Sequence, residues 1–317
     1  MKRVVIAGAS GFMGSYLRLS FEADGAAVTT IGRSGADAAW GDQDAIRRAV
    51  TGADLVLNLA GRSVNCRYKA HNREVILRSR IDTTRELGRA IASSDAPPPV
   101  WLNSSTATIY RHADDRPMTE STGELGSGFS VGIARAWEEA FFEEELPATR
   151  RVALRTAIVL GDGSALTPLL RLARFGLGCP QLDGRWPSTR ARREAGTYHE
   201  FRSRGGRQKF SWIHLADVDR AIRFIVEHPD LDGVVNLSSP NPTDNRMAMA
   251  TLRRVVGAPI GIPTWRWMLE IGSWAIRTET ELVLKSRWVV PERLTAAGFE
   301  FSYPELEQAV RAIVGRP

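Results

Sequence analysis

Short apolar runs alternate with longer amphipathic stretches through the first half of the chain. The runs predict strands over residues 3–9, 26–32, 54–61, 98–105 and 151–161. The amphipathic stretches predict helices that begin near Gly11, Asp42, Asn72, Ser130 and Ala165. Continuous apolar strands that alternate with helices are typical of a parallel sheet covered on both faces. The pattern therefore predicts an α/β fold with a doubly wound parallel sheet.

Beyond residue 161 the strict alternation fades. A strand and helix are expected over 212–228, a strand that runs into a turn over 233–244, and a closing helix within 286–314. We expect residues 1–161 to form one domain, to which strands at about 210–237 return, and residues 162–317 to form mainly a substrate lobe. The Trp-rich segment 264–276 is expected to be a packing face of that lobe, with a substrate pocket or a partner contact as alternatives.

Composition narrows the class of protein. At 317 residues, 43% hydrophobic and 25% charged, the chain can bury a large core. No stretch reaches the roughly 18 apolar residues of a membrane span, and no apolar signal-peptide region follows the first residues. Cys66 and Cys179 lie far apart and match no disulfide framework or ligand spacing. A cytoplasmic protein with no membrane association and no metal site is expected.

Positive charge is concentrated in one segment. The net charge is +6, and much of the excess falls between Gly184 and Lys209, within and after an Arg-rich insertion at about 183–204. Nucleic-acid binding is one interpretation. A solvated surface insertion is favoured, because the chain has only four lysines and uses arginine almost everywhere else. We therefore expect a small-molecule substrate and leave the oligomeric state open.

Three glycines follow the first predicted strand. Gly8, Gly11 and Gly14 stand between that strand and an amphipathic helix. The first allows a tight turn, the second lets backbone approach a pyrophosphate, and the third lets the helix pack close to the sheet. The pattern predicts a Rossmann nucleotide-binding loop, with cofactor contacts from Gly8, Ser10, Gly11, Phe12, Met13 and Gly14.

The second predicted strand ends in Arg33 and Ser34, and no acid appears before Asp37. A carboxylate at this position would hold the ribose 2′-OH of NAD, whereas an arginine accommodates the 2′-phosphate of NADP. The sequence favours NADP(H) over NAD(H), and the alternative is a solvated loop arginine.

With these motifs, the stretches "NLAG", "SSTATIY", "LRTAIVLG" and "FSWIHLADV" give a chain that resembles the extended short-chain dehydrogenases/reductases. More narrowly, it is similar to the atypical branch known as epimerase family proteins, NAD-dependent epimerase/dehydratase-like with no assigned substrate. The resemblance implies an NADP(H)-binding Rossmann domain and a smaller C-terminal substrate lobe. It also implies that Leu59, Ala60, Gly61 and Ser104 line the cofactor and that Thr106 bonds the reacting oxygen.

One part of the family pattern is missing. The superfamily uses a Tyr as acid/base and a Lys four residues later. Alignment on Glu138 puts Ser130 and Ala134 at these two positions, and a shift of one residue puts Phe129 and Ile133 there. In addition, none of the five tyrosines in the chain is followed by a lysine four residues later. Tyr110 and Lys69 are the candidates for the missing chemistry. The alternative for Tyr110 is a side chain that points back into the fold. Lys69 and Arg73 either stabilise an oxyanion or are solvated charges on a helix.

Two functions are compatible with these residues. The first is an NADP(H)-dependent oxidoreductase or epimerase-like enzyme that acts on a hydroxyl or carbonyl of a polar small molecule, for example a nucleotide sugar. The second is a catalytically lapsed NADPH-binding sensor or scaffold, in which the nucleotide stabilises the fold by mass action. The retained Thr106 and the later cleft motifs favour the enzyme.

Overall fold

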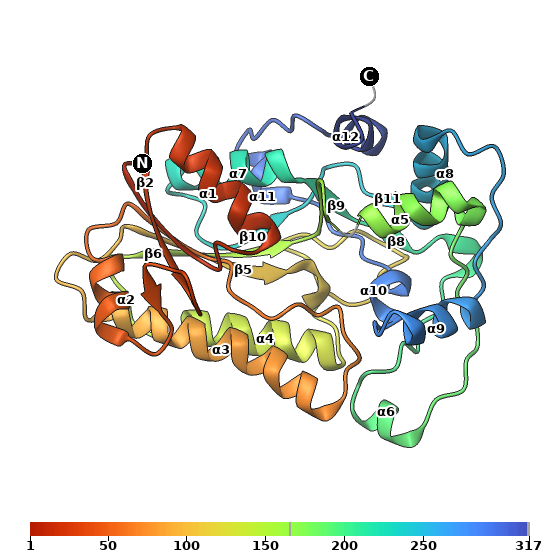
Figure 1. Ribbon diagram of the computed structural model, residues 1–317, viewed down its shortest axis with the longest axis horizontal. Coiled ribbons are helices and arrows are strands. Elements are labelled where there is room, and N and C mark those ends of the chain that lie inside the picture. Colours follow the sequence, from red (N-terminus) through yellow and green to blue (C-terminus); the bar gives the residue numbers. More distant parts are fainter. Residues whose placement is uncertain (165, 316–317) are drawn as a thin grey trace.

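The computed structural model describes residues 1–164 and 166–315 and has a parallel sheet of seven strands at its centre (Figure 1). The strand order is β10-β6-β5-β4-β1-β2-β3. The strands are β1 (Arg3–Ala7), β2 (Ala27–Gly32), β3 (Ala38–Ala39), β4 (Leu55–Asn58), β5 (Val100–Thr106), β6 (Arg150–Thr156) and β10 (Gly233–Leu237). Neighbouring strands all run parallel, so their carboxyl ends meet at one edge.

Helices cover both faces of the sheet, and this confirms the predicted doubly wound α/β fold. One face carries α1 (Phe12–Ala23), α7 (Leu215–Glu227) and α11 (Glu292–Ala296); the other carries α2 (Gln43–Val50), α3 (Ala70–Ala92) and α4 (Phe129–Phe142) (Figure 1). The apolar stripe of each helix meets strands buried on both sides: Leu17 and Ile222 pack on the first face, and Ile46 and Phe141 on the second.

The predicted strand over 151–161 is in fact two strands. After β6 the chain turns at Ala157, whose amide bonds the carbonyl of Leu237, and β7 (Ile158–Leu160) leaves the sheet. There β7 pairs with β9 (Trp212–His214), while β8 (Lys209–Phe210) pairs with β11 (Thr243–Asp244). Of the strands expected to return at about 210–237, only β10 joins the seven-stranded sheet.

The C-terminal lobe has its own apolar core. Helix α5 (Leu166–Leu172), a short π-helix (Ala173–Leu177), α8 (Asn245–Val256) and α12 (Leu306–Ile313) pack around Trp212, Leu252 and Val310. The helix predicted to begin near Ala165 has its first residue outside the described residues. After α11 the chain returns to the large sheet, where Leu294 and Phe299 join the core that contains Val4.

Helix α9 (Arg266–Ala275) corrects the prediction that the Trp-rich segment packs inward. Trp267 is 54% exposed and Trp274 is 71% exposed. The opposite face is polar and buried, because Arg266 bonds both Asp183 and Glu270. The helix is therefore inverted: its charged face is satisfied inside, and its aromatic face meets solvent.

The Arg-rich insertion is partly anchored rather than simply solvated. It contains α6 (Arg190–Glu194) and is followed by a 3₁₀ turn (Arg204–Gly206). Arg192 donates to Glu279 at 2.9 Å, and Asp183 accepts a bond from Arg266 of α9 at 2.8 Å. These contacts tie the insertion to α9 and to the segment before α10 (Glu281–Leu284).

Within the part of the chain that the structure describes, we find no helix with the length and apolar character required to cross a membrane.

Candidate functional site

The glycine loop between β1 and α1 forms a close-fitting backbone cradle. Gly8 has φ of +83°, and a Cβ there would lie 2.9 Å from the amide nitrogen of Ala60. A Cβ on Gly14 would lie 2.8 Å from the Cα of Ala9 and closer still to the Gly8 carbonyl. Gly11 precedes α1 with no side chain to cap the helix. The loop thus presents backbone N–H groups and the helix dipole to the carboxyl edge of the sheet.

The residues of this cradle fit a dinucleotide pyrophosphate. Ser10, Gly11 and Phe12 are exposed, Met13 is half-buried, and Gly14 is buried against the turn. Exposed backbone donors above a helix N-terminus are the arrangement that binds a phosphate, and a side chain at Gly8 or Gly14 would fill it.

The end of β4 forms the wall beside this loop. Leu59 and Ala60 lie against Gly8, and Gly61 is exposed. Asn58 is fully buried and accepts a bond from the Ala60 amide at 3.0 Å while it donates to Asn103 at 2.6 Å. Asn58, the last residue of β4, therefore holds the backbone of residues 58–60 in place.

Arg33 and Ser34 are exposed at the end of β2. Within residues 1–164 and 166–315 the Arg33 guanidinium makes no hydrogen bond or ion pair. Asp37, the first acid after β2, instead accepts bonds at 2.8 Å from both the amide and the hydroxyl of Thr30. These bonds hold the pKa of Asp37 below its usual value. The acid is thus engaged by β2, and the arginine is available to a ligand.

Thr106 is half-buried at the carboxyl end of β5, and Ser104 is buried two residues earlier. The Thr106 hydroxyl oxygen accepts a bond from the Thr108 amide at 3.1 Å, which caps a 3₁₀ turn over Ala107–Ile109. The hydroxyl proton has no acceptor among the described side chains and backbone groups around it. Thr106 can therefore donate to an oxygen at this edge of the sheet.

Tyr110 corrects the prediction that it could reach a substrate. The side chain is 1% exposed, its hydroxyl donates to Asn236 at 2.9 Å, and it accepts from Arg155 at 3.0 Å. The physical reason is the 3₁₀ turn, which rotates the chain after Thr106 and points the phenol into the core. Burial also raises the pKa of Tyr110, which further disfavours a phenolate.

Helix α4 carries the positions where the superfamily places its Tyr and Lys. Ser130 lies at the start of the helix and Ala134 is fully buried within it. Glu138, which follows, forms a buried pair with Arg155 at 2.7 Å and accepts a bond from Ser105 at 2.6 Å. Glu138, the acidic residue that this chain shares with the family pattern, thus supports β5 and β6. The aligned positions in α4 hold no Tyr–Lys pair.

Lys69 and Arg73 stand at the start of α3. Lys69 is exposed at the residue that precedes the helix. The Arg73 guanidinium lies 5.9 Å from the centre of the Phe129 ring, and its Nε is buried without a partner among the described residues. Both bring positive charge to the side of the sheet edge where α4 begins.

Sequence reasoning missed a polar cluster at this edge, which we call the Lys285 cluster: Tyr68, Thr108, Ser130, Glu281, Lys285 and Arg287. Lys285 is 3% exposed, and its Nζ donates to the Thr108 carbonyl at 2.7 Å. Arg287 donates to the Thr108 hydroxyl at 3.1 Å. The available signal was a lysine within the apolar run "LVLKSRWVV" of a chain that has four lysines.

The other side of the cluster is acidic. The Ser130 hydroxyl donates to Glu281 at 3.0 Å, and Tyr68 is buried against the Phe129 ring, 4.9 Å between centroids. Burial and the Glu281 charge raise the pKa of the Tyr68 phenol. Burial and the Arg287 charge lower the pKa of Lys285 to about 8, against the opposing effect of Glu281. Four separate segments therefore bring polar groups together here, and two of these segments supply the titratable ones.

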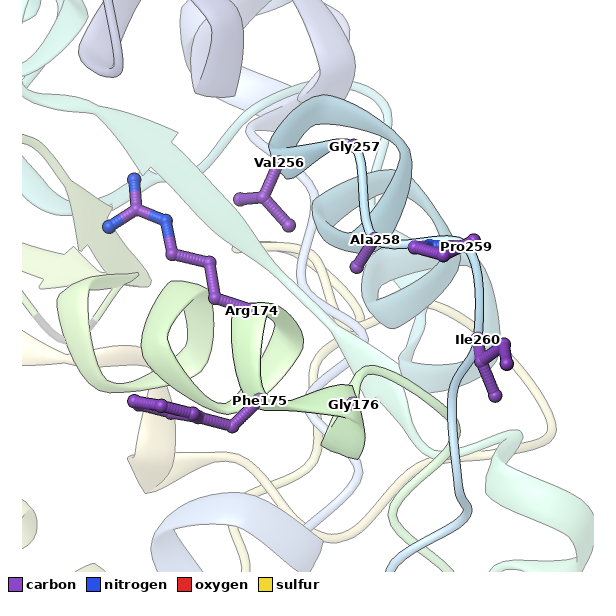
Figure 2. A pocket seen from close by; sticks show the side chains of 8 residues that line it. All are labelled: Arg174, Phe175, Gly176, Val256, Gly257, Ala258, Pro259 and Ile260. Atoms are coloured by element: carbon purple, nitrogen blue, oxygen red, sulfur yellow. The ribbon is translucent and has the colours of Figure 1, made fainter.

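A hollow of about 520 Å³ lies elsewhere, on the C-terminal lobe. It is lined by Arg174, Phe175, Gly176 and residues 256–260, and Figure 2 shows Arg174 and Val256 extending toward the same space while Phe175 points away. None of the predicted site residues lines it, and Arg174 is the one titratable side chain among those lining residues. We therefore place the candidate site at the carboxyl edge of the sheet.

In residues 1–164 and 166–315, no group of three or more His, Cys, Asp or Glu side chains could hold a metal ion.

Two family descriptions match separate parts of the chain. Residues 4–130 match the NAD dependent epimerase/dehydratase family, and residues 266–313 match a domain of unknown function, DUF1731. The first range holds the glycine loop, Arg33 and Thr106. The second holds α9 and three members of the Lys285 cluster, Glu281, Lys285 and Arg287.

Relatives match the chain along almost its whole length. The epimerase family protein YfhF of Bacillus subtilis (strain 168) is 27% identical over 98% of this chain and 97% of its own. The epimerase family protein SDR39U1 of Bos taurus is 29% identical over 98% and 99%. The crystal structure of human epimerase family protein SDR39U1 (isoform 2) with NADPH covers 99% of this chain and 100% of its own, with a TM-score of 0.82 and 25% identity.

Proposed function

Because the chain belongs to the epimerase family proteins, an atypical branch of the extended short-chain dehydrogenases/reductases, we propose that it is an NADP(H)-dependent oxidoreductase or epimerase-like enzyme. Its substrate is a polar small molecule with a hydroxyl or carbonyl group, and a nucleotide sugar is one candidate. The observation that carries the proposal is the backbone cradle of Gly8, Gly11 and Gly14 with the unpaired Arg33 beside it.

Different residues bind different parts of the cofactor. Exposed amides at the start of α1 receive the pyrophosphate, and Leu59 and Ala60 form the apolar wall along the adenosine and its ribose. Arg33 pairs with the 2′-phosphate, since Asp37 is bonded to Thr30 and is not free to hold a 2′-OH. The NADPH in the human relative supports this assignment.

Thr106 and the cluster beside it receive the substrate. A bound nicotinamide supplies hydride transfer to or from carbon. The Thr106 hydroxyl donates to the oxygen on that carbon and fixes its position at the end of β5. Positive charge from Lys285, Arg287 and Arg73 lies on the same side and stabilises negative charge that develops on the oxygen.

A second function rests on a different observation. Ala134 replaces the lysine that would hold the nicotinamide ribose, and Tyr110 is buried in a structural network. These features favour an NADPH-binding sensor or scaffold, in which the dinucleotide stabilises the protein without turnover.

Two measurements on the purified protein test the proposal. Calorimetry with NADPH and NADH should show binding of NADPH at least tenfold tighter. A single-turnover assay then follows nicotinamide absorbance while a panel of carbonyl compounds and nucleotide sugars is added. Oxidation by any member supports the enzyme. Tight NADPH binding with no oxidation across the panel supports the sensor, and no binding of either dinucleotide overturns both.

A further inference from the structure

One residue, Thr108, connects Lys285 to the hydroxyl expected to hold the reacting oxygen. The Lys285 Nζ donates to the carbonyl of Thr108, and the amide of Thr108 donates to the hydroxyl oxygen of Thr106. The lysine comes from the C-terminal lobe, whereas the two threonines follow β5 of the Rossmann sheet. The amine is therefore held at the junction of the two parts of the molecule.

The same short segment also reaches the position of the missing tyrosine. Ser130 stands where the superfamily has that residue, and its hydroxyl donates to Glu281 at 3.0 Å. Glu281 and Lys285 are four residues apart, at the start of α10 and directly after its end. Both places where proton-transfer groups are expected, the end of β5 and the start of α4, thus contact this one segment.

Charge at the cluster is not balanced within it. Lys285 and Arg287 are both buried, and Glu281 is the one carboxylate among the six members. Tyr68, packed from the segment before α3, is neutral, because burial and Glu281 raise its pKa. Glu279, two residues before Glu281, is already paired with Arg67 and Arg192. Burial first and the Arg287 charge second therefore lower the pKa of Lys285 to about 8, and the single carboxylate of Glu281 offsets only part of this shift.

We propose that Lys285 is the proton-transfer group of this protein, with its Nζ giving a proton to, or taking one from, the substrate oxygen that Thr106 holds. The inference rests on the proposed NADP(H)-dependent function. In the reductive direction the carbonyl carbon receives the hydride, and its oxygen takes the π electron pair and a proton from the Lys285 ammonium. The neutral amine then regains a proton from solvent. The oxidative direction reverses each transfer.

A lysine suits this role because its amine titrates near neutral pH once it is desolvated. The arrangement accounts for the loss of both family residues, since acid/base chemistry moves from α4 to the residue that follows α10. It also gives a role to the segment 266–313, which supplies Lys285. The competing explanation is a structural lysine that only satisfies the Thr108 carbonyl.

The oxidation state of the cofactor separates these explanations without a known substrate. The nicotinamide ring of NADP⁺ carries a positive charge, and that of NADPH is neutral. An amine at the reacting position should therefore have a lower pKa with NADP⁺ bound than with NADPH bound, by about one unit. A structural lysine remote from the ring would titrate identically in both complexes.

NMR can follow this titration, because the chain has four lysines. Protein labelled with carbon-13 at lysine Cε is titrated in the NADP⁺ and NADPH complexes. The Lys285 signal is assigned by its loss in Lys285→Arg. If that variant does not fold, arginine at Lys2, Lys69 and Lys209 leaves Lys285 as the remaining signal. Lys209, whose Nζ lies 4.3 Å from the Trp288 ring in the same lobe, is the control and should not respond to the oxidation state.

A lower Lys285 pKa with NADP⁺ than with NADPH supports the inference. Equal pKa values in two demonstrably bound complexes overturn it and leave the proposed cofactor function intact. Failure of the wild-type protein to bind either dinucleotide in calorimetry overturns the proposed function, and this inference with it.

Discussion

The glycine loop and the Lys285 cluster lie at the same edge of one sheet but are built in opposite ways. The loop consists of backbone from residues 8–14, and its main partners are its own turn and the end of the adjacent strand. The cluster consists of side chains from four separate segments, and the C-terminal lobe supplies half of its members. A site made of local backbone tolerates change elsewhere in the chain, whereas an assembled site depends on distant contacts.

The largest expected effect comes from breaking the support of the assembled site. Arg155→Met removes the partner of buried Glu138 and a donor to Tyr110, so we expect the free energy of unfolding to fall by about 3–5 kcal/mol. The double variant Glu138→Leu/Arg155→Met should recover part of this loss. Urea unfolding measures both variants.

A matched surface pair provides the control. Arg190→Met breaks the Arg190–Glu194 pair, in which the arginine side chain is 92% exposed, and should cost under about 0.5 kcal/mol. Equal losses for Arg155→Met and Arg190→Met would contradict the view that the buried pair supports β5 and β6.

The next effect tests the backbone cradle. Gly14→Ala places a Cβ 2.8 Å from the Ala9 Cα, so the turn must shift. We expect a loss of about 1–3 kcal/mol in stability and at least tenfold weaker NADPH binding by calorimetry. Gly132→Ala, in the first turn of α4 with no heavy atom within 4 Å of its new Cβ, should leave binding unchanged and stabilise the protein by up to about 1 kcal/mol. Unchanged NADPH affinity in Gly14→Ala would show that the cradle is not the phosphate site.

A smaller effect is expected on the preference for NADPH over NADH. Arg33→Ala should weaken NADPH binding about tenfold or more, because the guanidinium pairs with the 2′-phosphate, and should change NADH binding little. Arg48→Ala, which removes an exposed arginine from α2, is the control for net charge. If Arg33→Ala weakens the two dinucleotides equally, the 2′-phosphate is held by another residue.

The smallest effect concerns the contact between the loop after β5 and the end of the insertion. Burial raises the pKa of Asp114, but hydrogen bonds from His112, Ser286 and Ser203 outweigh it and hold the pKa at about 2. The folded value lies below the ordinary value of about 3.9, so this stabilisation is present above pH 4 and is lost as the pH falls toward 2.

Asp114→Asn should therefore cost less than about 1 kcal/mol at neutral pH, since the side chain is 39% exposed and solvent screens the interaction. The difference from wild type should shrink between pH 4 and pH 2, and urea unfolding at both ends of this range measures it. A constant difference would show that the charge on Asp114 does not contribute.

The loop could be predicted from sequence because its information is local. A glycine needed for a positive φ or a close approach stands next to the strand and helix that require it, and Gly8 and Gly14 have those roles here. The parallel sheet was predictable for the same reason, since each buried strand is a continuous apolar run. The division of the predicted strand 151–161 into two strands could not be predicted, because the chain leaves the sheet at a contact with Leu237, which is distant in sequence.

The assembled parts could not be predicted in the same way. The aromatic side of α9 was expected to face inward, but Asp183, 83 residues earlier, accepts a bond from Arg266 and places the polar side of the helix inside. Tyr110 could contact a substrate or point back into the fold on sequence grounds, and the turn after Thr106 and the distant Asn236 place it in the core. Lys285 carried one local signal, a lysine within an apolar run, and its contact with Thr108 spans 177 positions.

The return of the C-terminal segment to the large sheet has a consequence for synthesis of the protein. When a ribosome has made residues 1–161, the glycine loop exists, but β10 and the Leu294 and Phe299 side chains that seal the same core do not. The nascent Rossmann half thus keeps an open apolar surface until nearly the entire polypeptide has emerged. The half of the molecule that is translated first is therefore the last to have its apolar core completed.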